Sequence, residues 1–154
     1  MIEHLNLVAR LYGVADWKDR AAVLLEELDL ASKRNAVPAE LSRGMKQKLT
    51  IACGFLHDPA LVLLDEPLTG LDPVGIRKIK RSLKARAARG TAIVLSSHLL
   101  PLVEELCERV LVIAAGQAVA LGTIDAIRAE LGDHAGSLED LFVRIAGGDD
   151  GAIV

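Results

Sequence analysis

Two adjacent carboxylates, Asp65 and Glu66, follow the apolar run Leu61–Leu64 and precede Pro67. The run has the length and composition of a strand buried on both faces, and Pro67 is suited to end it because proline lacks a backbone N–H. In a parallel sheet, ligands bind beyond the carboxyl ends of the strands. One carboxylate there could hold Mg²⁺, and the other could orient or deprotonate an attacking water. An isolated Asp-Glu pair is more often simply solvated, so this chemistry depends on what other segments bring to the site.

Two other segments carry groups that suit a phosphate. Ser42 can cap a helix that begins near Gly44, and the free N–H groups and partial positive charge of a helix N-terminus attract anions. His98 follows a second apolar, β-rich run at 91–95, where it could hydrogen-bond a phosphate oxygen and a water. Taken singly, these segments are better explained as an ordinary helix cap and an exposed or structural histidine.

The elements that would position these groups are visible in the periodicity of apolar residues and in the turn signals. We expect helices at about 2–12, 16–28, 44–57, 73–89, 99–107 and 123–131. We expect strands at 61–64, 91–95, 109–114 and 118–121, the last two joined by a hairpin turn at Gly116-Gln117. Strands that alternate with helices predict an α/β fold with a mostly parallel sheet.

Composition excludes several classes of protein. With 154 residues, 51% of them hydrophobic and 25% charged, the chain has room for one folded domain. A net charge of −3 and 3% aromatic residues argue against a nucleic-acid partner, and we interpret the basic helix at 73–89 as a solvated face. No apolar run is long enough to cross a bilayer, and the first residues do not resemble a signal peptide. Cys53 and Cys107 lack metal-binding spacing and are expected to be buried free thiols of a cytoplasmic protein.

Four segments, in this order along the chain, resemble the nucleotide-binding motifs of ATP-binding cassette (ABC) ATPases. They are Leu41–Met45 (signature motif), Leu61–Glu66 (Walker B), Leu68–Asp72 (D-loop) and Ser96–His98 (switch histidine). Arg43 and Met45 depart from the commonest signature motif, in which glycine and glutamine are usual. The resemblance implies a P-loop NTPase-like (RecA-like) sheet, incomplete here, with a helical subdomain at 1–58, an α/β core at 59–131 and a C-terminal extension at 132–154.

The resemblance also implies roles for individual residues in a complete subunit. Asp65 would organise Mg²⁺, Glu66 would act on the attacking water, and His98 would hold the γ-phosphate of ATP. Asp72 would work across a dimer, and the second subunit's ATP would be contacted by the signature segment, which is Leu41, Ser42, Arg43, Gly44 and Met45. The implied cofactors are ATP and Mg²⁺. The implied partners are a second ATP-binding subunit and a transmembrane permease on the helical subdomain, at the cytoplasmic face of the membrane.

One motif of the family is missing from the sequence. There is no Gly-Lys dipeptide and hence no Gly-x-x-x-x-Gly-Lys-[Ser/Thr] phosphate loop, and by resemblance Met1 lies beyond the position of this loop. We therefore expect the C-terminal portion of a subunit that couples ATP hydrolysis to export, of the ABC-2 or multidrug type, inactive alone but able to contact ATP in trans. The alternative is a catalytically inactive interaction or dimerisation module from a truncated gene. A third candidate, an SMC-type or DNA-repair ATPase, would need a long coiled coil, which the sequence lacks.

The missing motif has an expected structural cost. In the family, the strand before the phosphate loop lies between the strands that match 91–95 and 109–114. Without it, both strands lose hydrogen-bond partners and apolar faces become exposed. We hypothesise that the two strands close the gap, that another chain supplies the strand, or that the chain is poorly soluble.

Overall fold

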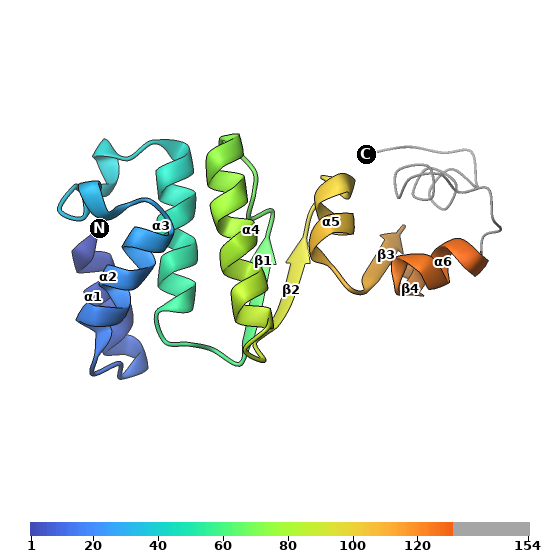
Figure 1. The fold of residues 1–154 in the computed structure, drawn as a ribbon, viewed down its shortest axis with the longest axis horizontal. Helices are drawn as coiled ribbons and strands as arrows, with labels where there is room; N and C mark the ends of the chain where they lie inside the picture. The colour runs from blue at the N-terminus through green and yellow to red at the C-terminus, as the bar shows by residue number, and fades with distance from the viewer. Residues whose placement is uncertain (131–154) are drawn as a thin grey trace. The chain divides into compact units, whose positions relative to one another are not determined.

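The structure, a computed structural model, describes residues 1–130. These residues form an α/β fold, as predicted (Figure 1). They divide into two compact units, one formed by Met1–Ser97 and one that begins at His98. The subdomain boundaries expected at 58 and 131 stay a prediction, and the expected C-terminal extension at 132–154 lies outside the described residues. Among residues 1–130, every helix is too short or too polar to pass through a bilayer.

The first unit begins with three helices that share a core. They are α1 (Ile2–Tyr12), α2 (Trp17–Glu27) and α3 (Arg43–Phe55), with the short 3-10 turns η1 (Ala31–Lys33) and η2 (Pro38–Glu40) between α2 and α3. Each helix buries one stripe of side chains, including Leu5 from α1, Leu25 from α2 and Phe55 from α3. Gly13 ends α1 in the left-handed conformation, with φ of 67°.

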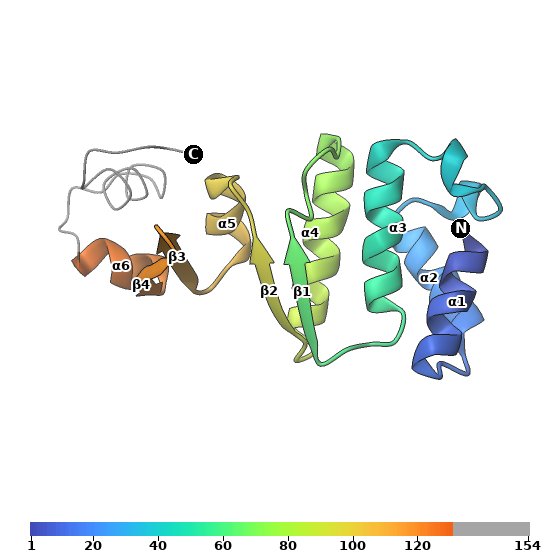
Figure 2. The same cartoon turned by 180° about the vertical axis from the view of Figure 1, so that it is seen from behind.

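The rest of the first unit is a βαβ segment formed by β1 (Leu61–Asp65), α4 (Pro73–Ala87) and β2 (Ala92–Ser96). The two strands are parallel, and α4 lies on one face of them, beside α3 (Figure 1 and Figure 2). Val62 is 7% exposed, whereas Leu61 and Leu63 are 54% and 72% exposed. Burial of this strand on both faces was therefore a wrong prediction. Side chains alternate along a strand, and the described residues cover only the face that carries Val62.

The second unit contains α5 (Leu100–Leu106), the antiparallel strands β3 (Val110–Ala114) and β4 (Gln117–Gly122), and α6 (Ile124–Glu130). The predicted hairpin is confirmed, but its turn lies one residue earlier than predicted, at Ala115-Gly116, because Gln117 already pairs with Ala114 as the first residue of β4. Ala115 and Gly116 both have positive φ, as a two-residue turn of type I′ requires. Within residues 1–130, β1 pairs only with β2 and β3 only with β4. The three hypothesised outcomes for the gap between 91–95 and 109–114 stay predictions.

Candidate functional site

The two adjacent carboxylates lie at the carboxyl end of β1, as predicted. Asp65 is opposite Ser96 in the parallel register, and the Ser96 hydroxyl donates a hydrogen bond to Oδ1 of Asp65. The backbone N–H of Glu66 donates to the Ser96 carbonyl at 3.2 Å and to the Ser96 hydroxyl at 3.3 Å. Ser96 thus fixes both acidic residues, a role that the sequence analysis missed.

Asp65 and Glu66 belong to different local structures. Asp65 is the last residue of β1, whereas Glu66 has φ of 44° and begins a turn closed by the Thr69 N–H, which donates to the Glu66 carbonyl at 3.2 Å. The Thr69 hydroxyl also donates to Oε2 of Glu66 at 3.0 Å. A left-handed conformation costs a residue other than glycine about 1–3 kcal/mol, and these bonds help to hold Glu66 in it. The Asp65 side chain is exposed and that of Glu66 is half-buried.

The signature-like segment forms the N-terminus of α3. Ser42 is the N-cap, and its hydroxyl accepts a hydrogen bond from the Met45 N–H at 3.2 Å, as predicted. Leu41 is 5% exposed and anchors the segment in the core, while Ser42 and Arg43 are exposed. The first-turn N–H groups of an α-helix have no partner within the helix, so this end of α3 can receive an anion.

The structure brings the signature-like segment against the D-loop-like segment. A Cβ atom at Gly44 would lie 3.2 Å from the Gly70 carbonyl oxygen and 3.4 Å from Cδ2 of Leu71. Gly70 has φ of 77°, and a Cβ atom there would lie 3.1 Å from Nε of Arg43. The absence of side chains at both glycines permits this contact, and the Arg43 side chain lies along Gly70. Arg43, which stands where the family usually has glycine, therefore supplies part of the packing between the two segments.

Asp72 is the N-cap of α4. Its Oδ1 accepts a hydrogen bond from the Gly75 N–H at 2.9 Å, and Pro73 occupies the first helical position, which suits proline. The Gln47 side chain of α3 donates to the Pro67 carbonyl at 3.4 Å. The turn between β1 and α4 is thus connected to its own helix and to α3. The expected role of Asp72 across a dimer stays a prediction. Its role as the cap of α4 was not predicted and comes from the structure.

His98 is exposed and lies two residues beyond β2, where it begins the second unit. Its carbonyl accepts a hydrogen bond from the Leu100 N–H at 3.1 Å, which leads into α5. The first unit therefore contains the signature-like segment, Asp65, Glu66 and Asp72, and the second contains His98. The predicted role of His98 on a phosphate stays a prediction.

The residues present fit Mg²⁺ and one side of a phosphate group. Asp65 offers an exposed carboxylate, and Mg²⁺ prefers oxygen ligands and is commonly held by one or two carboxylates together with substrate phosphates and water. Within residues 1–130, no three His, Cys, Asp or Glu side chains gather closely enough to hold a metal by themselves. A cation at Asp65 would therefore take further ligands from a nucleotide or from water.

Comparisons with known proteins identify similar chains. The family model described as "ABC transporter" matches residues 3–69. The "ABC-type transporter ATP-binding protein EcsA" of Bacillus subtilis is 33% identical over 98% of this chain and 62% of its own length. The "Nod factor export ATP-binding protein I" of Paraburkholderia xenovorans is 41% identical over 84% of this chain and 44% of its own length. A solved structure, "Structure of ATP binding subunit of ABC transporter", has a TM-score of 0.87 at 38% identity, covering 93% of this chain and 60% of that one.

Proposed function

The chain belongs to the ATP-binding family of ABC transporters, and we propose that it is part of a subunit that couples ATP hydrolysis to export across a membrane. The chain spans about three fifths of the length of EcsA and of the solved ATP-binding subunit. Export is supported by the similarity to the Nod factor export protein. The transported substrate would be chosen by the membrane partner, so this chain does not specify it.

The observation that carries the proposal is the contact between Gly44 and the Gly70–Leu71 turn. It joins the N-terminus of α3 to the segment before α4, so two motifs that the family uses at a dimer interface lie side by side in one folded unit. We infer that this surface contacts ATP held by a second subunit. Ser42 and Gly44 would present backbone N–H groups to a phosphate, and Asp72 would fix the neighbouring turn while facing the partner.

The carboxylates would serve the other half of the chemistry. ATP with Mg²⁺ supplies the phosphoanhydride bond and the cation that neutralises its charge. Asp65 would hold the Mg²⁺, with its orientation set by Ser96. Glu66 would orient a water and accept its proton, and His98 would hold a phosphate oxygen. In this chain, Ser96 and Thr69 hold the two carboxylates through the hydrogen bonds described above.

The partners follow from the same assignment. A second ATP-binding subunit would pair with the surface around Gly44, and a transmembrane permease would dock on α1 and α2. Exposed apolar side chains on these helices support the docking surface: Leu7, Leu11, Tyr12 and Val23 are 58%, 73%, 61% and 65% exposed. The protein would then lie at the cytoplasmic face of the membrane, bound peripherally.

The second candidate is an interaction or dimerisation module without catalysis. For this chain taken by itself, it is favoured because the 154 residues contain no Gly-Lys dipeptide, whereas the phosphate loop normally surrounds the β- and γ-phosphates of ATP. The two candidates differ in whether the chain changes the binding of ATP by a partner.

Calorimetry separates these candidates. Mg-ATP is titrated into the chain alone, into a full-length ABC subunit alone, and into their mixture. The proposal predicts no heat from the chain alone and tighter binding in the mixture than in the full-length subunit by itself. Binding that is equal with and without the chain would favour the non-catalytic module. Micromolar binding by the chain alone would contradict the expectation that a phosphate loop is needed.

A further inference from the structure

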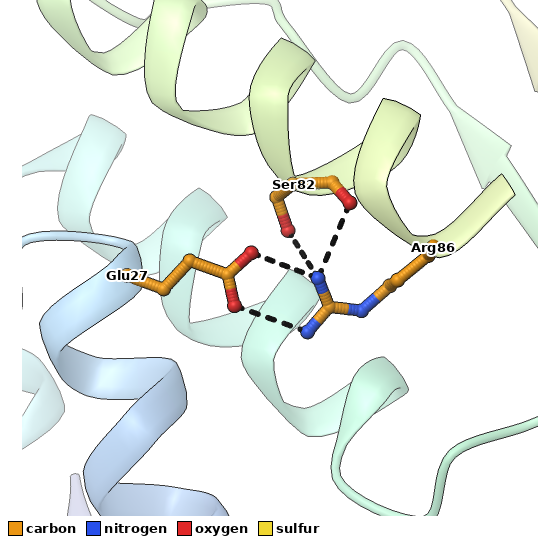
Figure 3. Close-up of polar contacts among 3 residues, drawn as sticks. All are labelled: Glu27, Ser82 and Arg86. Carbon is orange, nitrogen blue, oxygen red and sulfur yellow. Dashed lines mark hydrogen bonds and ion pairs between the residues drawn. The ribbon is translucent and has the colours of Figure 1, made fainter. Parts of the chain in front are cut away.

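Arg86, near the C-terminal end of α4, joins its own helix to α2 through Glu27 (Figure 3) and also contacts α3. It is 7% exposed, unusual for an arginine. Its guanidinium contacts Glu27 of α2, Phe55 of α3 and Ser82 of its own helix. The proposed nucleotide-contacting surface does not include Arg86.

The hydrogen bonds of Arg86 are those of a fixed side chain. Nη1 and Nη2 donate to the two carboxylate oxygens of Glu27 at 2.8 and 3.2 Å, and Nη1 also donates to the Ser82 hydroxyl at 2.6 Å. The guanidinium carbon lies 4.0 Å from the centre of the Phe55 ring, a cation–π arrangement. A planar, bidentate contact of this kind fixes orientation as well as distance, which a lysine could not do.

The titration of Glu27 agrees with this geometry. Burial raises the pKa of the Glu27 carboxyl, but hydrogen bonds from Arg86 and Ser82 and the positive charges of Arg86 and Arg89 outweigh burial, so the pKa lies below its ordinary value. Glu27 is therefore a carboxylate at neutral pH and pairs with Arg86 as an ion.

The helices α3 and α4 run parallel to each other. Arg86 lies at their C-terminal ends, and the proposed site lies at their N-terminal ends. At their N-terminal ends, Gly44 of α3 meets the Gly70–Leu71 turn, and at their C-terminal ends Phe55 meets Arg86. Phe55 lies eleven positions after Gly44, which is about 16 Å along a helix. Over that length, a shift of about 1 Å at the Arg86 end tilts α3 by about 4°.

We propose that Arg86 is a positioning residue that sets the angle between α3 and α4, so that the signature-like segment at Ser42–Gly44 stays in register with the turn at Gly70–Asp72. The contacts of Arg86 with Phe55 and Glu27 restrain this angle through two helices. Phe55 belongs to α3, and Glu27 belongs to α2, which packs against α3. That the positioned segment contacts ATP rests on the proposed function. That Arg86 sets the angle between the helices does not depend on it.

The test is nuclear magnetic resonance of the ¹⁵N-labelled chain with two substitutions. Arg86→Lys keeps the charge but loses the bidentate contact, and Glu27→Gln keeps the shape but loses the ion pair. Arg20→Lys is the matched control, because Arg20 lies on α2, as Glu27 does, but forms a more exposed ion pair. Its Nε lies 2.9 Å from Oδ2 of Asp16, and its side chain is 41% exposed. The readouts are the amide signals of Gly44 and Gly70 and the hydrogen exchange of the Met45 amide, which donates to Ser42.

The proposal predicts that both substitutions at the ion pair shift the Gly44 and Gly70 signals and make Met45 exchange several-fold faster, relative to the wild type. Arg20→Lys should leave all three unchanged. Changes confined to the surroundings of Glu27, Phe55 and Ser82 would show that Arg86 acts only locally and would overturn the proposal. If Arg86→Lys fails to fold, Glu27→Gln alone decides between these two outcomes.

Failure of the proposed function is a separate result. If the wild-type chain does not alter ATP binding in the mixture but the Gly44 and Gly70 signals move as predicted, the assignment to ATP is wrong and the positioning role stands. If the mixture responds but the signals do not move, the positioning role is wrong.

Discussion

The carboxylates at the end of β1 and the ion pair at the end of α4 belong to one folded unit, but they differ in exposure to water. Asp65 is exposed, with a hydroxyl on one oxygen, whereas both oxygens of Glu27 are bonded to an arginine that is 7% exposed. An exposed carboxylate can take a cation or a ligand at little cost. A half-buried carboxylate whose two oxygens are hydrogen-bonded to a buried arginine instead holds helices together. The same residue types thus serve chemistry in one place and packing in the other.

Removal of the buried cation should have the largest effect. Arg86→Ala leaves the half-buried Glu27 carboxylate without its partner and Phe55 without its neighbour, and we expect a loss of about 1–3 kcal/mol in the free energy of unfolding. Urea denaturation measures it. Arg77→Ala, at an exposed cation of the same helix, is the control and should change stability by less than about 0.5 kcal/mol. Equal losses of unfolding free energy in the two variants would show that the Arg86 ion pair stabilises the fold no more than an exposed charge does.

Capping of α4 should have a smaller effect. Asp72→Ala removes the acceptor for the Gly75 N–H and should lower the free energy of unfolding by about 1 kcal/mol. Asp16→Ala is the matched comparison, because Asp16 is the N-cap of α2 but its side chain pairs with Arg20 and makes no capping hydrogen bond. Its loss should therefore be smaller when both variants are compared by thermal unfolding. A larger loss at Asp16 would contradict the assignment of caps.

The Glu27–Arg86 ion pair should also give stability a dependence on pH. Because the pKa of Glu27 is lower in the folded chain than its value of 4.5 in the unfolded chain, its contribution is present above about pH 4.5. The contribution is lost as the pH falls through the folded pKa. The difference in unfolding free energy between the wild type and Glu27→Gln should therefore shrink at acidic pH. A difference that stays constant from pH 7 to pH 3 would show that the charge of Glu27 is not involved.

The exposed carboxylate should have the smallest effect on stability. Asp65→Asn keeps an oxygen for the Ser96 hydroxyl and should change the free energy of unfolding by less than about 0.5 kcal/mol. A loss of several kcal/mol in denaturant unfolding would show that Asp65 stabilises the fold, as Glu27 and Arg86 do.

Local signals explain which parts of the fold could be predicted from the sequence. The bounds of α1, the Ser42 cap of α3 and the hairpin between β3 and β4 depend on residues close together in the chain, and all three predictions are confirmed. The spacing of Ile2, Leu5, Val8 and Leu11 forms an apolar stripe on α1, yet Leu11 is 73% exposed. Spacing identifies a stripe but does not say how far along the helix another element covers it.

Contacts between distant residues explain what was missed. Arg86 was assigned to a solvated basic face, but it is buried because Glu27, 59 residues earlier, lies beside it. Asp16 stands at the N-cap of α2, a position that aspartate favours, but its carboxylate binds Arg20 and makes no capping hydrogen bond. At the site, Asp65 and Glu66 were recognised by type and position, whereas Ser96 was not assigned a role. The register that places Ser96 opposite Asp65 could have indicated it, since both end their strands.

The most direct test of the account compares two glycines of α3 in the mixture with a full-length ABC subunit. A Cβ atom at Gly44 would press on the Gly70 carbonyl at 3.2 Å, whereas a Cβ atom at Gly54 would meet nothing within 4 Å. We predict that Gly44→Ala loses the gain in Mg-ATP affinity that the wild-type chain confers and that Gly54→Ala retains it, with both variants folded. Equal affinities for the two variants would contradict the claim that this end of α3 contacts a partner's ATP.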